Sequence, residues 1–261
     1  MTTIPPVVPA LPRENPYARD LPPGSVRAWL GAGWRDLVTN PVPSLLYGVL
    51  VFLLSVTIIL GLALLQWDYI LFPALAGFLV FAPVLAVGLY EKSRAIEQGE
   101  PATFARMAMP RAKTRGQILF MGALLSGLML LWMRSAIIIF ALFFGVRPFP
   151  GLDHVAGVLF ATPTGWMILA VGSVVGGLFA AFTLAIAAFS IPMMLDQRVD
   201  AFTAMGTSWA LVWNNLSTMV LWGATVLALF LLCVATGMLG LIVVFPWLGH
   251  ATWHAYKSVR P

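Results

Sequence analysis

The stretch SLLYGVLVFLLSVTIILGLALLQ, residues 44–66, decides the fold class of this chain. A segment of that length forms about 34 Å of α-helix, which is enough to cross the hydrocarbon core of a bilayer once. The whole composition agrees, because 60% of the 261 residues are apolar and only 10% are charged. A soluble domain carries roughly a quarter charged residues. These values exclude a water-soluble globular protein and predict an all-α polytopic membrane protein.

Further apolar segments follow, separated by short polar breaks, and together they predict six transmembrane helices. Pro83 falls in the second half of the second span, where it is expected to kink the helix. A proline recurs in the fourth and sixth spans, at Pro192 and Pro246. The last two spans are short, which favours some local thinning of the bilayer. The expected spans are residues 44–66, 69–90, a third that starts near Gln117, 165–195, 217–236, and a last helix that follows the Gly237–Gly240 turn and ends near Tyr256.

The basic residues are distributed unevenly between the two sides of the membrane. Six spans place both termini on one side, and every Lys and Arg except Arg134 and Arg147 falls on that side. Cytoplasmic loops carry such an excess of basic residues, so both termini are predicted to be cytoplasmic. A net charge of +5 also occurs in nucleic-acid-binding proteins. Here the orientation of the spans accounts for it, and no nucleic-acid partner is expected.

Each odd-numbered span follows a semi-polar stretch that begins with an aromatic residue. The second and third of these stretches share the pattern F-x-x-M, at 104–107 and 202–205. We interpret the chain as three similar units, each an interfacial amphipathic helix followed by a helical hairpin. Chance similarity of composition is the alternative. The units are residues 24–100, 101–198 and 199–261, and their interfacial helices are expected at Trp29–Asn40, Phe104–Gly116 and Phe202–Asn215.

Two segments stand apart from these units. Residues 1–23 are rich in proline and are predicted to form an extended cytoplasmic arm before a single membrane domain, residues 24–261. The middle unit carries an insertion at about residues 134–164 on the outer face. This insertion could cross the membrane, re-enter it or lie on its outer surface.

Few polar residues are candidates for chemistry inside the bilayer. Arg134 lies about 26 Å along the third span, near the outer interface, where snorkelling is expected. A partner for it would be Asp68 or Asp153. No Asp or Glu falls at mid-membrane, since Glu91 and Asp196 stand at the inner ends of their spans. This pattern argues against a proton pump or an ion-coupled symporter.

His250 and His254 form the one candidate pair of metal ligands. Their i, i+4 spacing places both rings on the same helix face. Two ligands do not make a site, however, so packing or hydrogen bonding at the inner interface is the preferred role. The sequence also contains no pair of nucleophile and base that can be placed together. No metal, cofactor or catalytic residue is therefore predicted.

Three motifs together resemble a known bacterial family of membrane proteins. They are FPALAGF at residues 72–78, GLYEKSR at 88–94, and FPWLGHATWHAY at 245–256, which contains Trp253; the second includes Tyr90 and Glu91. They are similar to the uncharacterised integral membrane proteins grouped as domain of unknown function 2189. The resemblance extends from about Trp29 to Tyr256. It implies a bacterial inner membrane and, because some members are labelled cytochrome c oxidase components, a link to respiratory complexes.

Two functions are consistent with these observations. The first is a non-catalytic accessory subunit or assembly factor that packs against a larger membrane complex, respiratory if the family label applies. The second is a small transporter or channel for a neutral or lipid-like substrate. Besides the lipid bilayer, the first function requires other membrane-protein subunits as partners. Haem and copper chemistry would need several deep histidines, which this chain lacks.

Overall fold

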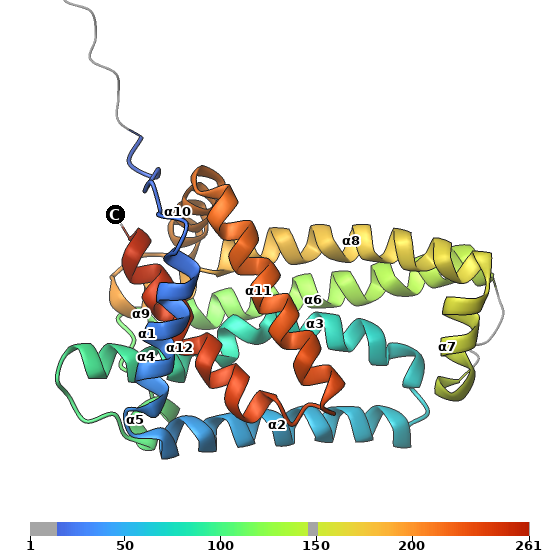
Figure 1. The fold of residues 1–261 in the computed structure, drawn as a ribbon, viewed down its shortest axis with the longest axis horizontal. Coiled ribbons are helices and arrows are strands. Elements are labelled where there is room, and N and C mark those ends of the chain that lie inside the picture. The colour runs from blue at the N-terminus through green and yellow to red at the C-terminus, as the bar shows by residue number, and fades with distance from the viewer. Residues whose placement is uncertain (1–14, 146–150, 261) are drawn as a thin grey trace, which may run out of the picture.

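The computed structural model describes residues 15–145 and 151–260, and this part of the chain is helical without any strand. In Figure 1, α2, α3, α6 and α8 run along the long axis of the molecule, and the other helices gather mainly at one end. The helices are α1 (Ser25–Val38), α2 (Pro41–Leu64), the short 3-10 helix η1 (Asp68–Ile70), α3 (Leu71–Leu85), α4 (Val87–Glu97), α5 (Phe104–Ala108), α6 (Arg115–Phe144), α7 (Leu152–Ala161), α8 (Pro163–Ala187), α9 (Ser190–Asp196), α10 (Ala201–Asn214), α11 (Leu216–Ala235) and α12 (Leu241–Val259).

Five helical segments in the described ranges are long and apolar enough to cross a bilayer. The all-α membrane architecture is thus confirmed, whereas six spans are not, because α12 is not among these segments. The reason is its composition: α12 includes His250, Thr252 and His254 and buries most of its length inside the protein. The five segments are Pro41–Leu64, Leu71–Glu97, Arg115–Phe144, Pro163–Asp196 and Leu216–Ala235.

Two of these segments contain a break near their C-terminal ends. The second segment divides into α3 and α4 at Ala86, one turn after Pro83. Proline donates no backbone hydrogen bond and disturbs the preceding turn, which explains an irregularity at this point. The hydroxyl of Tyr47 donates to the carbonyl oxygen of Leu85 at 2.7 Å and so satisfies a group near the break. In the fourth segment, α8 gives way to α9 just before Pro192, which lies in the first turn of α9.

Helices are found at the positions predicted for the three interfacial helices, with one correction. The first and third lie within a few residues of the predicted ranges, as α1 and α10. The second, predicted at Phe104–Gly116, is only the five-residue helix α5. Pro110 follows shortly after it, lacks an N–H group and disfavours a helical conformation in Met109. The chain therefore leaves the helix early and resumes only at α6.

The range predicted as an insertion contains two different structures. The helix α6 continues without a break through Arg134 to Phe144. After residues 146–150, which lie outside the described part, α7 packs against the beginning of α8 (Figure 1). The side chain of Thr162 accepts a hydrogen bond from the Gly165 N–H and so caps α8.

Part of the predicted N-terminal arm lies against the helices. Asn215, between α10 and α11, accepts from the Arg19 N–H at 3.1 Å and donates to the Tyr17 carbonyl oxygen at 2.8 Å. The Arg19 guanidinium also donates to the carbonyl oxygen of Val259 at 3.0 Å. Residues 15–23 thus connect the start of α11 with the end of α12, whereas residues 1–14 of the predicted arm lie outside the described residues.

The core is concentrated where α1, α4, α5, α9, α10 and the C-terminal half of α12 meet, a region we term the charged end (Figure 1, left). Helix α12 lies at its centre, packed against α1, α2, α4 and α9. Gly33 of α1 allows a close approach to α12, because a Cβ atom there would lie 2.5 Å from the backbone nitrogen of Ala251. Trp29 and Trp222 meet edge to face in the same core, with ring centroids 5.7 Å apart.

Candidate functional site

The charged end encloses a chain of hydrogen bonds between Lys92, Ser44, His250 and Ser93. Lys92 Nζ donates to Ser44 Oγ at 2.7 Å and to the Asn40 carbonyl oxygen at 2.8 Å. The imidazole of His250 lies between two hydroxyl groups, with Nε2 2.9 Å from Ser44 Oγ and Nδ1 2.8 Å from Ser93 Oγ. All four side chains are completely buried. This arrangement, which we term the Lys92 cluster, joins α2, α4 and α12.

The direction of these hydrogen bonds follows from the chemistry of the end group. Because an ammonium group only donates, Ser44 accepts from Lys92 and directs its own hydrogen toward Nε2 of His250. In the neutral ring, Nδ1 then carries the proton and donates to Ser93. Among the described residues, no carboxylate lies within ion-pair distance of Lys92. The ammonium is therefore contacted directly by oxygen dipoles, and the charge of the nearby Asp36 carboxylate acts on it from a longer distance.

Asp36 of α1 lies beside this cluster and accepts from His254. The distance between Asp36 Oδ2 and His254 Nε2 is 2.8 Å. Burial raises the pKa of the Asp36 carboxyl, but hydrogen bonds from His254 and Ser93 outweigh it, and the pKa lies below its ordinary value. His254 also lines an open cleft that it shares with Arg19 and Arg35. Asp36 thus links the buried cluster to a group at the surface.

A second polar group is built around Glu91, whose side chain is completely buried. Its two carboxylate oxygens accept from Arg94 at 2.5 Å and from Arg106 at 2.7 Å. Arg94 also donates to the carbonyl oxygens of Leu195 and Arg111, at 2.6 and 2.8 Å. These contacts, the Glu91 cluster, tie α4 to α5, to the end of α9 and to the loop before α6. Within the described part, the Nε of Arg94 has no hydrogen-bond partner.

Polar contacts also hold the end of α12. The hydroxyl of Tyr256 donates to Asp196 at 3.2 Å and accepts from Gln197 at 3.1 Å. Arg260 forms an ion pair with the same Asp196 carboxylate at 3.1 Å. Two helices distant in sequence, α9 and α12, are thereby fixed to each other.

The chemistry open to these groups is limited by their burial. Ser44 and His250 have the contact that a nucleophile and its base require, but each has an exposed fraction of 0%. Both ring nitrogens of His250 contact hydroxyl groups, so neither is open to a metal ion or a substrate. Among residues 15–145 and 151–260, no three His, Cys, Asp or Glu side chains gather as metal ligands would. The arrangement is suited to holding four helices in one orientation.

The structure separates the two histidines that the sequence paired. His250 points into the Lys92 cluster, whereas His254, one turn later, binds Asp36 of α1. Trp253 is completely buried between them, and its Nε1 has no partner in the described part of the chain. The ammonium of Lys257 lies 5.8 Å from the centroid of the Trp253 ring.

The other predicted residues lie in different environments. Tyr90 and Glu91 are buried in the charged end, and Pro246 lies inside α12. Arg134 is exposed on α6, as snorkelling requires. Its predicted partners, Asp68 and Asp153, have side chains outside the described set, so that pairing stays a prediction.

Sequence reasoning missed most members of the two clusters. It treated Lys92, Arg94 and Arg106 as solvated charges that orient the spans, whereas all three are largely or completely buried. One signal was present: residues 91–94 place a carboxylate, an ammonium, a hydroxyl and a guanidinium directly after an apolar run. Four consecutive polar residues make about one helical turn and face all sides of the helix, so some of them must meet other helices.

Comparison with known proteins identifies one family. Residues 71–196 match the model of the family described as Predicted integral membrane protein (DUF2189). The predicted resemblance is confirmed over this segment. It contains two of the three motifs, at residues 72–78 and 88–94, and the Glu91 cluster, whereas the third motif, at 245–256, lies beyond it. No curated protein and no solved structure matches the chain. The chain is an integral membrane protein with several apolar helices, and the DUF2189 segment supplies three of its five candidate spans.

Proposed function

We propose that this protein is a non-catalytic component of a bacterial inner membrane that serves as an accessory subunit or assembly factor of a larger complex. One observation carries the proposal: the groups that could perform chemistry are paired with one another and have no access to a substrate. Lys92, Ser44, His250 and Glu91 each have an exposed fraction of 0%. A set of closed, satisfied polar groups stabilises one arrangement of helices. Function then resides in the surface that this arrangement presents.

The proposal includes an orientation in the membrane. Counting α12 as the sixth membrane helix places both termini on the cytoplasmic side, together with the charged end. The distribution of Lys and Arg supports this orientation. It also places the exposed tryptophans of α10, Trp209 and Trp213, near the level of the headgroups, where such side chains are enriched. Because some members of the DUF2189 family are labelled cytochrome c oxidase components, a respiratory complex is the first partner to test.

The test compares a deletion strain complemented with the wild-type chain, Ser44→Ala or His154→Ala. His154, exposed in α7 far from both clusters, is the matched control. Membranes are solubilised in a mild detergent, and the larger assembly is quantified on native gels and by mass spectrometry. If the role is architectural, the amount of assembled complex in the Ser44→Ala strain should be proportional to the amount of folded Ser44→Ala protein. If folded Ser44→Ala were present at wild-type levels and assembly were still lost, the hydroxyl would have a chemical role and the proposal would be contradicted. The proposal would also be contradicted if the wild-type chain migrated alone and its deletion changed no complex.

The alternative function is a transporter or channel for a neutral or lipid-like substrate. The structure contains an apolar groove between α2 and α3 that favours the lipid-like form of this alternative over a polar solute. Reconstituted vesicles that show no flux of a panel of neutral solutes would count against the transport of polar substrates.

A further inference from the structure

The turn between α11 and α12 stops short of the far ends of α2 and α3. Helix α11 has 20 residues and α2 has 24, lengths of about 30 and 36 Å. Figure 1 shows the turn beside α2, before the end of that helix. At its tip, Met238 lies against Ile58 and Leu62, which belong to the last two turns of α2. The α11–α12 hairpin therefore ends beside the apolar surface of α2, before the far end of that helix.

The backbone of this tip is suited to such a position. Gly237 has a positive φ of 61°, which glycine adopts without a Cβ clash. The N–H of Met238 donates to the Cys233 carbonyl oxygen at 2.7 Å, and the N–H of Gly240 donates to the Thr236 hydroxyl at 3.0 Å. Irregular backbone is tolerated at membrane depth when its polar groups are satisfied within the protein.

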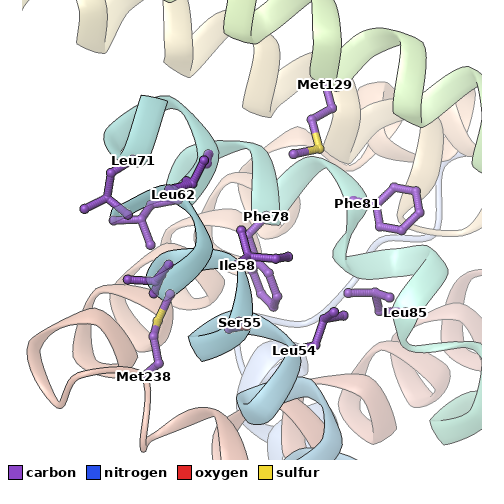
Figure 2. A pocket seen from close by; sticks show the side chains of 13 residues that line it. Leu54, Ser55, Ile58, Leu62, Leu71, Phe78, Phe81, Leu85, Met129 and Met238 are labelled. Atoms are coloured by element: carbon purple, nitrogen blue, oxygen red, sulfur yellow. The ribbon is translucent and has the colours of Figure 1, made fainter. Parts of the chain in front are cut away.

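The short hairpin leaves a groove above its tip, with a cavity volume of about 200 Å³. Its lining includes Leu54, Ile58 and Leu62 of α2 and Phe78 of α3, and Figure 2 shows Met129 of α6 at the top of the view and Met238 of the hairpin tip at the lower left. Leu54 and Ile58 are about half exposed, at 47% and 49%, so the groove opens sideways toward the bilayer. An apolar cavity of roughly 150 Å³ holds a benzene ring, so this one has room for a stretch of hydrocarbon.

The lining selects the chemistry of the occupant. Ser55 is the one side chain with a polar group among the lining residues, and its hydroxyl already donates to the Val51 carbonyl oxygen at 2.9 Å. A headgroup or a polar solute would lose its own hydrogen bonds here without replacement. A cavity of about 200 Å³ is also too small to enclose a partner helix, which is about 10 Å across. Lipid acyl chains surround α2 and α3 at this depth.

We propose that this groove is a binding site for one acyl chain of a membrane lipid, with Met238 as its floor. Met129 and Met238 supply flexible, polarizable contacts that adapt to a chain without fixed geometry. The occupant differs from the annular lipid that covers the other exposed leucines, because α2, α3, α6 and the hairpin tip enclose it. This inference does not depend on the accessory role proposed above.

The test uses the full-length protein in vesicles of phosphatidylethanolamine and phosphatidylglycerol that contain a phosphatidylglycerol with a photoactivatable diazirine in one acyl chain. Cross-linked peptides are mapped by mass spectrometry after illumination. We expect the yield at 54–62, 71–85 and Met238 to exceed, several-fold, the yield at Leu130 and Leu142, which are more exposed. Equal yields at all of these positions would mean annular lipid only and would overturn the proposal.

A pair of variants tests whether the groove itself is responsible. Ala74→Phe places a ring in the groove, and Ala123→Phe adds the same ring at an exposed position of α6. Groove labelling should fall several-fold in Ala74→Phe and stay unchanged in Ala123→Phe, with both variants eluting as folded protein. Unchanged labelling in folded Ala74→Phe would contradict the proposal. If Ala74→Phe does not fold, the positional yields in the wild-type chain decide the question.

Discussion

The charged end and the groove region of α2 and α3 hold helices together in opposite ways. At the charged end, Lys92, Glu91 and Arg94 are buried and bound to specific partners at 2.5–2.8 Å. Around the groove, Phe78 stacks on Phe230 and meets Phe245 at its edge, and the remaining contacts are apolar. Each polar contact requires one geometry, whereas apolar side chains fit several. The comparison predicts a molecule whose architecture is set at one end and whose other end can adapt to lipid.

The largest expected effect is the removal of Glu91. Glu91→Ala leaves the buried Arg94 without its carboxylate, and such a loss costs about 3–5 kcal/mol. For a chain of this size, the melting temperature in detergent should fall by roughly 10 °C. The measurement is the fraction of monodisperse protein that remains after heating. Glu97→Ala is the matched control on the same helix, because the Glu97–Lys257 pair is partly exposed and such pairs contribute at most about 1 kcal/mol. Equal effects of the two substitutions would show that burial of the Glu91 cluster is not what stabilises this end.

Two glycines test the difference in packing directly. A Cβ at Gly33 meets the backbone of Ala251, whereas a Cβ at Gly77 meets only the flexible side chain of Met129, at 3.1 Å or more. Gly33→Ala must separate α1 from α12 and should cost about 1–3 kcal/mol. Gly77→Ala should change stability by less than about 0.5 kcal/mol, because the methionine can move.

Gly31→Ala is the control for helix propensity, since nothing lies within 4 Å of a Cβ there. It should stabilise α1 by about 0.5–1 kcal/mol. Thermal melting of the three variants in one detergent gives the order. If Gly77→Ala were as harmful as Gly33→Ala, the groove region would be as rigid as the charged end.

Lys92→Met asks whether the buried cation stabilises the charged end or only specifies its geometry. Removing a buried charge that has no direct ion-pair partner also removes its desolvation penalty. Ser44 keeps its contact with His250, and the acceptors that lose a donor are the Ser44 hydroxyl oxygen and the Asn40 carbonyl oxygen. The melting temperature should therefore change by only a few degrees, much less than in Glu91→Ala. A loss as large as that of Glu91→Ala would mean that the ammonium itself holds α2 against α4.

The sequence predicted the helices better than it predicted the site, for a physical reason. A membrane helix is selected by the length of its apolar run, which is local, so α2 and α11 lie within three residues of their predicted ranges. The clusters depend on pairs distant along the chain, such as Ser93 with His250, 157 residues apart. The hydrophobic periodicity of α4 does not indicate which polar side chain α12 will present to it, and the reverse is also true. The predicted length of α5 was wrong for a local reason, because Pro110 ends the helix early. This proline could have been recognised in the sequence.

The smallest expected effect is the pH dependence that Asp36 contributes. Burial raises the pKa of this carboxyl, but hydrogen bonds from His254 and Ser93 lower it by more, so its pKa in the folded protein lies below the unfolded value of about 3.9. A depressed folded pKa means that its stabilising contribution is complete above about pH 4 and is lost as the pH falls through the folded value. Asp36→Asn should therefore flatten the decrease in melting temperature below about pH 4, by a few degrees at most. Asp20→Asn, at an exposed position of the N-terminal segment, is the control and should leave that decrease unchanged. If Asp36→Asn followed the wild-type curve, the contact between α1 and α12 would rest on Gly33 and its apolar neighbours, and the charged end would depend less on polar pairing than the buried clusters indicate.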